Sequence, residues 1–301
     1  MSLALLVTGA GGQLSDDLLD AVRGARDVFA RGLTIKDLDI TDAFAVQDMV
    51  VGWERIVRSD NPDHRLVVVN CAAYTAVDAA ETDEETAYAV NAAGPALLAT
   101  ACAKVGAGLI HVSTDYVFPG DAKQPYDVDD PTGPQGAYGR TKLAGELAVR
   151  EILPDDSWVV RTAWLYGAHG NNIIKTMTRL ERERETVAFV ADQTGSPTWS
   201  HDLAGGLLAL AGSDAPAGNY HATNRGETTW YGLARAVFEE VGADPDRVQP
   251  IRTEDYPLPA PRPAYSVLSP RAWDAAGLPP FRGWREALAE AFATSGDAFR
   301  P

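Results

Sequence analysis

The sequence predicts an α/β protein built on a doubly wound parallel sheet, and three observations support this class. Short apolar runs alternate with helical patterns along the first half of the chain. The runs are continuous rather than alternating, as in strands buried on both faces of a sheet. A glycine-rich turn, residues 9–12, separates the first run from the first helical pattern. This strand, loop and helix order is typical of a Rossmann-type sheet.

The elements follow in order along the chain. Strands are expected at residues 3–7, 66–69, 109–112 and 158–161, and helices follow the glycine-rich turn and cover residues 86–105, 137–150 and 173–184. We expect residues 187–190 and 219–222 to extend the first sheet as further strands. The five prolines of residues 257–270 exclude a helix and indicate an ordered loop.

Two domains are expected from this order. Residues 1–166, with about 187–224, would form the dinucleotide-binding domain. Residues 167–186 and 225–301 would form a smaller, discontinuous substrate domain.

Composition and charge exclude several classes of protein. Hydrophobic residues make up 46% of the 301 residues, and charged residues 23%, as in soluble globular proteins. With 26 basic and 42 acidic residues, the net charge of −16 repels nucleic acid and anionic membranes. An anionic ligand must therefore be held by backbone N–H groups and a few local cations.

The cysteines and the N-terminus predict a cytoplasmic protein. Cys71 and Cys102 both stand in apolar surroundings, where reduced thiols behave as small hydrophobic side chains. The first residues lack the basic region and long apolar stretch of a signal peptide.

The glycine-rich turn is a candidate dinucleotide site. Backbone N–H groups and the positive end of the following helix can hold a pyrophosphate. Gly9 permits the tight turn and Gly12 lets a phosphate approach the backbone, whereas Ser15 stands where a third glycine is usual. The second strand should end near Thr34, which is not the acid expected for NAD. With Arg31 and Lys36 nearby, we expect NADPH, unless these two are ordinary solvated charges.

A phenol and an ammonium group occur four residues apart in Tyr138-Gly-Arg-Thr-Lys142, on one face of a helix start. A cation beside a tyrosine lowers the phenol pKa and favours proton transfer. Thr114 follows a central strand, where parallel sheets bind ligands, so Thr114 and Tyr138 could reach one carbonyl oxygen. His111, preceded by apolar residues, is expected to be a core histidine.

Several segments together carry a resemblance to a known family. They are Thr8-Gly-Ala-Gly-Gly-Gln-Leu14, Asp37-Leu-Asp-Ile-Thr-Asp42, Val69-Asn-Cys-Ala-Ala-Tyr-Thr-Ala-Val-Asp78, Ser113-Thr-Asp-Tyr-Val-Phe118, Tyr138-Gly-Arg-Thr-Lys-Leu-Ala-Gly-Glu146, Arg161-Thr-Ala-Trp-Leu-Tyr166, Gly170-Asn-Asn172, Asp192-Gln-Thr-Gly-Ser-Pro-Thr198 and Arg262-Pro263. The chain resembles the dTDP-4-dehydrorhamnose reductase family of extended short-chain dehydrogenase/reductases, over essentially its whole length.

The resemblance implies an activity and its residues. It implies NADPH-dependent reduction of the 4-keto group of dTDP-4-dehydro-L-rhamnose, with NADH also accepted by some members. Thr114, Tyr138 and Lys142 match the catalytic residues. The matching cofactor contacts are Gly9, Gly12, Gln13, Leu14, Asp39, Ile40, Ala73, Tyr74 and Thr75, together with Tyr138 and Lys142. The matching substrate contacts are Thr114, Asp115, Trp164 and Arg262.

Alternatives remain at this point. The chain could reduce another dTDP-linked 4-keto-6-deoxyhexose, in natural-product glycosylation, or serve as a non-catalytic NADP-binding regulatory subunit. Trp164 could be a core residue at the domain boundary, and Arg262 could brace the proline-rich loop by binding carbonyl groups.

Some relatives hold Mg²⁺ between two subunits through acidic side chains. The matching positions in this chain are Asp17, His201 and Glu290. An imidazole in place of a carboxylate removes an oxygen ligand and a charge, and Mg²⁺ requires oxygen ligands. We therefore expect no metal, and a monomer or a weak, metal-independent homodimer.

Overall fold

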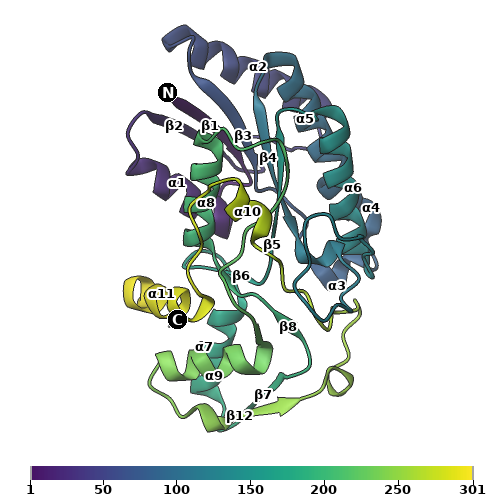
Figure 1. Cartoon of the computed structure of the whole chain (residues 1–301), viewed down its shortest axis with the longest axis vertical. Coiled ribbons are helices and arrows are strands. Elements are labelled where there is room, and N and C mark those ends of the chain that lie inside the picture. Colours follow the sequence, from purple (N-terminus) through teal and green to yellow (C-terminus); the bar gives the residue numbers. More distant parts are fainter. Residues whose placement is uncertain (1, 300–301) are drawn as a thin grey trace.

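The centre of the molecule is a six-stranded parallel sheet, in a computed structural model that describes residues 2–299 (Figure 1). Its strand order is β10-β5-β4-β3-β1-β2. The strands are β1 (Leu3–Thr8), β2 (Val28–Leu33), β3 (Arg65–Asn70), β4 (Gly108–Thr114), β5 (Ser157–Thr162) and β10 (Gly218–His221). The predicted doubly wound sheet is confirmed. Because β2 and β3 lie on opposite sides of β1, a crevice is expected at the carboxyl ends of β1 and β3.

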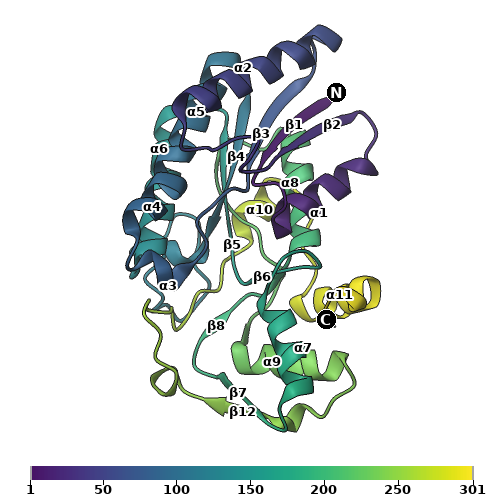
Figure 2. The ribbon, with the colours of Figure 1, turned by 180° about the vertical axis from the view of Figure 1, so that it is seen from behind.

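Helices cover both faces of this sheet (Figures 1 and 2). The helices α1 (Gln13–Arg23) and α8 (Ser200–Gly212) pack together on one face, over a core that includes Leu5 and Val67. On the opposite face lie α2 (Ala43–Asp60), α5 (Gly94–Val105) and α6 (Ala137–Ile152). The helix predicted over residues 86–105 is confirmed as α4 (Glu84–Tyr88), the π-helical turn η1 (Ala89–Ala93) and α5.

A second lobe lies beyond the carboxyl ends of the strands. It contains α7 (Ile173–Glu183), α9 (Trp230–Glu240) and α11 (Trp284–Phe299) around a separate apolar core (Figure 1). The strand β7 (Val187–Val190) pairs in parallel with β12 (Val248–Ile251) in this lobe. The expectation that residues 187–190 extend the first sheet is therefore wrong. Ala188 is exposed, so this strand is not covered along its whole length, whereas a central parallel strand is buried on both faces.

The strand expected at residues 219–222 does join the first sheet, as β10 beside β5. The remaining short elements are α3 (Val77–Ala80), β6 (Leu165–Tyr166), β8 (Thr194–Gly195), β9 (Thr198–Trp199), β11 (Thr228–Thr229), α10 (Arg271–Ala275) and the 3₁₀ turns η2 (Asp115–Val117), η3 (Pro245–Arg247) and η4 (Thr253–Asp255). No helix within residues 2–299 combines the length and apolar character that crossing a bilayer would require.

The proline-rich segment is an ordered connection between the lobes, as predicted. The Tyr265 N–H donates to the Gly120 carbonyl at 2.9 Å, and the Ser266 N–H donates to the Thr194 carbonyl at 2.9 Å. Gly120 has a φ of +84°, and a side chain there would lie 2.5 Å from Pro263. The segment therefore fastens β8 of the second lobe to the loop that follows β4.

A buried ion pair fixes α6 to the sheet. The Arg161 guanidinium on β5 donates to both carboxylate oxygens of Glu146 on α6, with Nε–Oε1 and Nη2–Oε2 distances of 3.0 and 2.7 Å. Both side chains are only 3% exposed. The guanidinium also lies 4.9 Å from the centre of the Phe118 ring. The ion pair between Arg161 and Glu146 sets the position of α6, which carries Tyr138 and Lys142.

We expect Glu146→Ala to lower the free energy of unfolding by about 3–5 kcal/mol, because it leaves the Arg161 charge buried without its partner. Urea denaturation measures this change. The matched control is Glu183→Ala, which removes the partner of Arg179 in a pair where both side chains are about half exposed. That pair should contribute less than about 1 kcal/mol. Equal effects of the two substitutions would contradict the role given to the buried pair.

Candidate functional site

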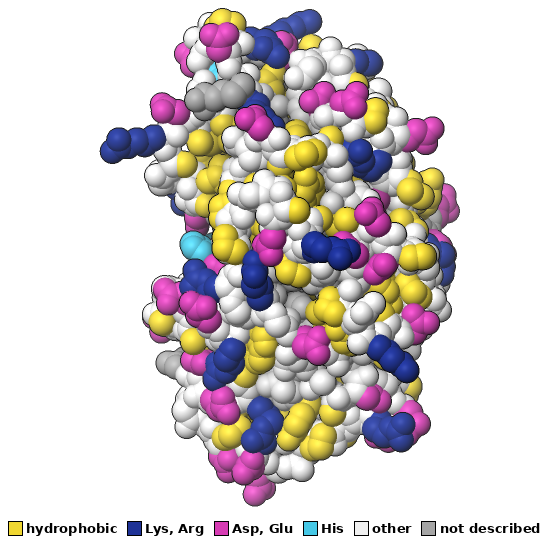
Figure 3. Space-filling model, viewed as in Figure 1, with side chains coloured by type: hydrophobic (Ala, Val, Ile, Leu, Met, Phe, Trp, Pro, Cys, Tyr) yellow, Lys and Arg dark blue, Asp and Glu magenta, His cyan; other side chains and the backbone are white. Residues whose placement is uncertain are grey.

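A cavity of about 930 Å³ opens along the carboxyl ends of β1, β3, β4 and β5 and reaches Trp230 in the second lobe. Of the predicted site residues, all but Arg262 line it. They are Gly9, Gly12, Gln13, Leu14, Asp39, Ile40, Ala73, Tyr74, Thr75, Thr114, Asp115, Tyr138, Lys142 and Trp164. Basic side chains on the face shown in Figure 3 are interspersed with acidic ones rather than gathered in one patch. An anion in this cavity must therefore rely on local donors.

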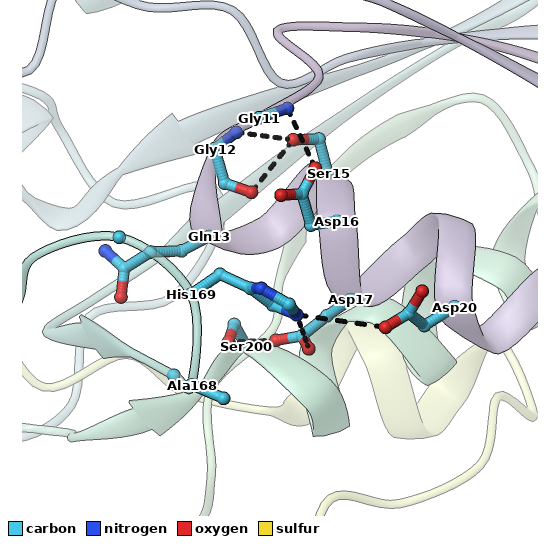
Figure 4. A network of polar contacts seen from close by, with 12 residues as sticks. Gly11, Gly12, Gln13, Ser15, Asp16, Asp17, Asp20, Ala168, His169 and Ser200 are labelled. Carbon is cyan, nitrogen blue, oxygen red and sulfur yellow. Dashed lines mark hydrogen bonds and ion pairs between the residues drawn. The ribbon is translucent and has the colours of Figure 1, made fainter. Parts of the chain in front are cut away.

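The glycine-rich turn has the geometry of a phosphate-binding loop. Gly9 has a φ of +76°, and a side chain there would lie 2.7 Å from the Ala72 nitrogen. Ser15, in place of a third glycine, donates its hydroxyl to the Gly9 carbonyl at 2.7 Å. The same hydroxyl accepts the Gly12 N–H at 3.1 Å (Figure 4). The serine thus braces the turn. Gln13 and Leu14 are the first residues of α1. The first N–H groups of a helix have no partner within it and are available to a ligand.

The end of β2 contains an acid that sequence reasoning missed. The Asp37 carboxylate accepts both the N–H and the hydroxyl of Thr34, at 2.9 and 2.6 Å. These hydrogen bonds lower the Asp37 pKa below its usual range. Neither Asp37 nor the basic residues Arg31 and Lys36 line the cavity. The Thr-x-x-Asp spacing of Thr34 and Asp37, typical of a capping box, is the signal that could have revealed this partner.

Sequence reasoning missed two further residues that contact the predicted cofactor-binding residues or lie beside them in the cavity. Ile35 lines the cavity next to Asp39 and Ile40, and it is 69% exposed. Asn91, fully buried in the π-helical turn, accepts the Tyr74 N–H at 2.9 Å and donates to the Tyr74 carbonyl at 3.1 Å. Its amide also donates to the Thr141 hydroxyl at 3.2 Å. Asn91 therefore fixes the loop after β3 against α6, and π-helical turns often mark functional sites.

The structure brings Thr114, Tyr138 and Lys142 together at the carboxyl end of β4. Thr114 ends that strand, and its hydroxyl donates to Asp115 Oδ1 at 3.0 Å. Lys142, 2% exposed on α6, donates its ammonium to the Val112 carbonyl at 2.7 Å. The Tyr138 ring contacts the edge of Tyr116, with ring centroids 5.6 Å apart.

Burial is the largest influence on the pKa values of Tyr138, Lys142 and Asp115. It raises the pKa of Tyr138 to about 12, against the opposing hydrogen bond of Thr114. The expectation that a neighbouring cation lowers the Tyr138 pKa is therefore wrong in this structure, because desolvation outweighs the other effects. Burial also lowers the pKa of Lys142 to about 8 and raises that of Asp115 to about 6. At neutral pH Tyr138 is protonated and can supply a proton to a bound oxygen.

Arg262 lies outside the cavity lining. Its guanidinium binds both oxygens of the Asp78 carboxylate, at 2.8 and 2.7 Å, and donates to the Ala260 carbonyl at 2.8 Å. This geometry matches the alternative in which Arg262 braces the proline-rich segment. A diphosphate would have to compete with Asp78 for the same donors.

His111 and Cys102 are core residues, as predicted, whereas Cys71 is only partly buried and lines the large cavity. His111 is fully buried, its Nδ1 lies 3.0 Å from the Asn70 amide, and burial lowers its pKa well below the usual value. It is therefore neutral. Burial raises the pKa of Cys71 to about 12, and that of Cys102 also rises. Both thiols are unpaired and protonated at neutral pH.

The chain is similar to known proteins over nearly its whole length. The family model described as RmlD substrate binding domain matches residues 3–296. A dTDP-4-dehydrorhamnose reductase of Streptomyces griseus is 52% identical over 98% of this chain and 95% of its own. The chain belongs to the RmlD family.

Two other members of the RmlD family bear on substrate and cofactor. A dTDP-4-keto-6-deoxy-D-glucose reductase of Streptomyces niveus is 47% identical, covering 95% of this chain and 96% of its own. The solved structure of a dTDP-4-dehydrorhamnose reductase of Bacillus anthracis in complex with NADP has a TM-score of 0.90 and 36% identity. The match covers 97% of this chain and 99% of that one.

A second cavity, of about 200 Å³, contains the three positions that the resemblance matches to a metal site. Asp17, His201 and Glu290 line it together, as their predicted equivalence requires, but so does Arg282, whose guanidinium is paired with Asp202 at 3.1 Å. Asp17 Oδ2 accepts the Ser200 hydroxyl, and Oδ1 lies 3.7 Å from His169 (Figure 4). A fixed cation and an imidazole do not suit Mg²⁺, which prefers carboxylate and water oxygens. The residues present do not fit this metal.

We expect Lys142→Met to raise the free energy of unfolding at pH 7 by about 1–3 kcal/mol, because a charged ammonium is removed from a buried position. The folded pKa of Lys142 is about 8 and the unfolded value is 10.5. Between these values the unfolded chain binds more protons, so the wild type gains stability as the pH rises. The difference between wild type and variant should therefore shrink from about pH 8 to pH 10.5.

Thermal unfolding across this pH range measures the effect. The control is Lys104→Met on the exposed surface of α5, which should change stability by less than about 0.5 kcal/mol. A Lys142→Met variant that is less stable than the wild type at pH 7, or a difference independent of pH, would contradict the interpretation.

Proposed function

We propose that this protein is an NADPH-dependent reductase that converts dTDP-4-dehydro-L-rhamnose to dTDP-L-rhamnose. The observation that carries the proposal is the single cavity shared by the glycine-rich turn and by Thr114, Tyr138 and Lys142. Membership of the RmlD family, with a relative of that name at 52% identity, supports the substrate. The NADP complex of the B. anthracis relative supports the cofactor, with NADH as a second donor.

The cavity residues fit a dinucleotide. The turn at Gly9 and Gly12 and the start of α1 offer backbone donors to a pyrophosphate, and Asp39 with Ile40 lies toward the adenine end. Ala73, Tyr74 and Thr75 follow β3, between the turn and Thr114. When bound, NADPH supplies the hydride that reduces the carbonyl carbon.

The residues of this chain then handle the oxygen. Thr114 donates a hydrogen bond to the C4 carbonyl oxygen and fixes its direction. Tyr138 transfers its phenolic proton to the alkoxide that develops there, because an aliphatic alkoxide is a stronger base than a phenolate. The ammonium of Lys142 stabilises the resulting phenolate, which regains a proton from solvent. The high pKa of Tyr138 keeps the acid loaded before each turnover.

The substrate contacts are proposed for Asp115, Trp164 and Arg262. Asp115 and Trp164 line the cavity beside Thr114, whereas Arg262 would have to leave Asp78. We further propose that residues 1–166 and most of 187–224 bind the cofactor, while 167–186 and 225–301 complete the sugar site, with β7 belonging to the second lobe. Work in the cytoplasm, where NADPH and reduced thiols are maintained, suits the two unpaired cysteines.

A second candidate is reduction of another dTDP-linked 4-keto sugar, which the S. niveus relative at 47% identity favours. Following NADPH oxidation with dTDP-4-dehydro-L-rhamnose and determining the C4 configuration of the product separates the two. The regulatory-subunit alternative predicts no turnover with any such substrate. It has less need for a buried lysine and a protonated tyrosine in one cavity.

We expect Tyr138→Phe to lower kcat by about 100-fold or more, the usual contribution of a general acid, while the affinity for NADPH stays nearly unchanged. Steady-state turnover and fluorescence titration with NADPH measure the two quantities. Tyr88→Phe, at an exposed position on α4, is the control and should keep wild-type turnover. Wild-type turnover by Tyr138→Phe would remove Tyr138 from the mechanism.

We also propose a monomer or weak homodimer that needs no metal, since the second cavity contains Arg282 and His201. Sedimentation and turnover should both be insensitive to EDTA. Added Mg²⁺ after EDTA treatment is the control and should change neither measurement. A dimer that separates only when Mg²⁺ is removed would show that Asp17 and Glu290 do hold a shared ion.

A further inference from the structure

Trp230, the first residue of α9, connects the second lobe with the large cavity. Its indole ring lies on that of Trp164, with ring centroids 3.4 Å apart and planes within 6° of parallel. Both rings line the cavity and both are half-buried. Trp164 follows β5 of the central sheet and Trp230 begins α9, and both rings pack against the core of the second lobe, so together they form one apolar surface where the sheet meets that lobe.

The position of Trp164 is fixed by its surroundings. Its backbone has a φ of +47°, in the left-handed region that non-glycine residues seldom adopt. A side chain at Gly195 on β8 would lie 2.4 Å from Trp164 Cε2, so the glycine leaves the space that the indole occupies. The Trp164 carbonyl accepts the Thr198 N–H at 3.2 Å. Such strain persists only where neighbouring structure holds it, and it often marks a functional site.

The ring of Trp230 is held equally firmly. Its Nε1 donates to Gln193 Oε1 at 3.1 Å, and the Gln193 amide donates to the Thr253 hydroxyl at 3.0 Å. The Thr229 hydroxyl accepts the Gly232 N–H at 3.0 Å and caps α9. Because protein already satisfies the single polar atom of this indole, the ring offers the cavity only apolar surface.

The strand order places this surface at the substrate end. Thr114 on β4 is paired in register with Thr162 on β5, and Trp164 follows two residues later. Since β5 lies on the side of β4 away from β1, the tryptophan pair lies across Thr114 from the glycine-rich turn. A carbonyl held by Thr114 would thus have the cofactor on one side and the indoles on the other.

We propose that Trp230 is a specificity-determining residue, which with Trp164 forms the wall that contacts the C5 methyl group of a 6-deoxy-4-keto sugar. This inference rests on the proposed function. The methyl group is the apolar substituent next to C4, and its transfer from water to an indole surface is favourable. A sugar with a hydroxymethyl group at that position would bring a polar group against a wall with no partner for it.

Calorimetric titration of the NADP⁺ complex with dTDP and with dTDP-L-rhamnose tests the inference. Trp230→Ala should weaken dTDP-L-rhamnose binding about fourfold or more, as expected for exposing one methyl-sized group, and leave dTDP binding unchanged. Trp230→Phe, which keeps an aromatic wall, should restore much of the difference. The matched control is Trp284→Ala, because Trp284 packs against the same apolar core but lies outside the cavity lining.

Circular dichroism gives an independent readout. Stacked indoles produce an exciton couplet in the far ultraviolet, which should disappear in both Trp230 variants and persist in Trp284→Ala. Addition of dTDP-L-rhamnose should change the wild-type couplet, and dTDP should not. Equal losses for the two nucleotides, or no loss for either, would overturn the role of Trp230. Failure of the wild type to bind either nucleotide would overturn the proposed function instead.

Discussion

The close approach of α6 to the backbone around it is the constraint on which the site depends. A side chain at Gly139 would lie 2.3 Å from the Tyr116 carbonyl oxygen, and one at Gly145 would lie 2.1 Å from that of Asn91. Only glycine lets the helix lie this close to the turn after β4 and to the π-helical turn. The phenol of Tyr138, beside the first of these glycines, is thereby placed at the end of β4.

This close packing also explains the electrostatics of the site. Excluding water raises the pKa values of Tyr138 and Asp115 and lowers that of Lys142, so that the neutral form of each group is favoured. Each group is costly to bury, and the surrounding structure must offset that cost. The bidentate pair of Arg161 and Glu146, one turn beyond Lys142, anchors the helix that carries the costly groups. The ion pair therefore anchors α6 directly behind the cavity, where burial of Tyr138, Lys142 and Asp115 costs free energy.

Local pattern predicted much of this protein, and contacts between distant segments set the limits. The alternation of strands and helices, the glycine-rich turn and the Tyr138–Lys142 pair are visible over a few neighbouring residues, so the class of sheet could be predicted from them, while most other cavity residues were predicted from the family resemblance. The ion pair of Arg262 and Asp78 joins positions 184 residues apart, and no local pattern announces it. The prediction that residues 187–190 extend the first sheet was wrong for the same reason, because a short apolar run does not reveal which strand it will pair with. The pKa of Tyr138 depends on total burial, which the four-residue spacing cannot report.

Both lobes line the large cavity, and the residues proposed for the chemistry and for substrate specificity lie in different parts of it. The side chains proposed for the chemistry, Thr114, Tyr138 and Lys142, all belong to the first lobe, on β4 and α6. The wall at Trp230 belongs to α9, and β8 beside it is hydrogen-bonded to the proline-rich segment. That segment returns to Gly120, a few residues beyond Thr114. Because the proline-rich segment contains none of Thr114, Tyr138 and Lys142, this connection between β8 and the loop after β4 is made by backbone hydrogen bonds and is separate from the side chains proposed for the chemistry.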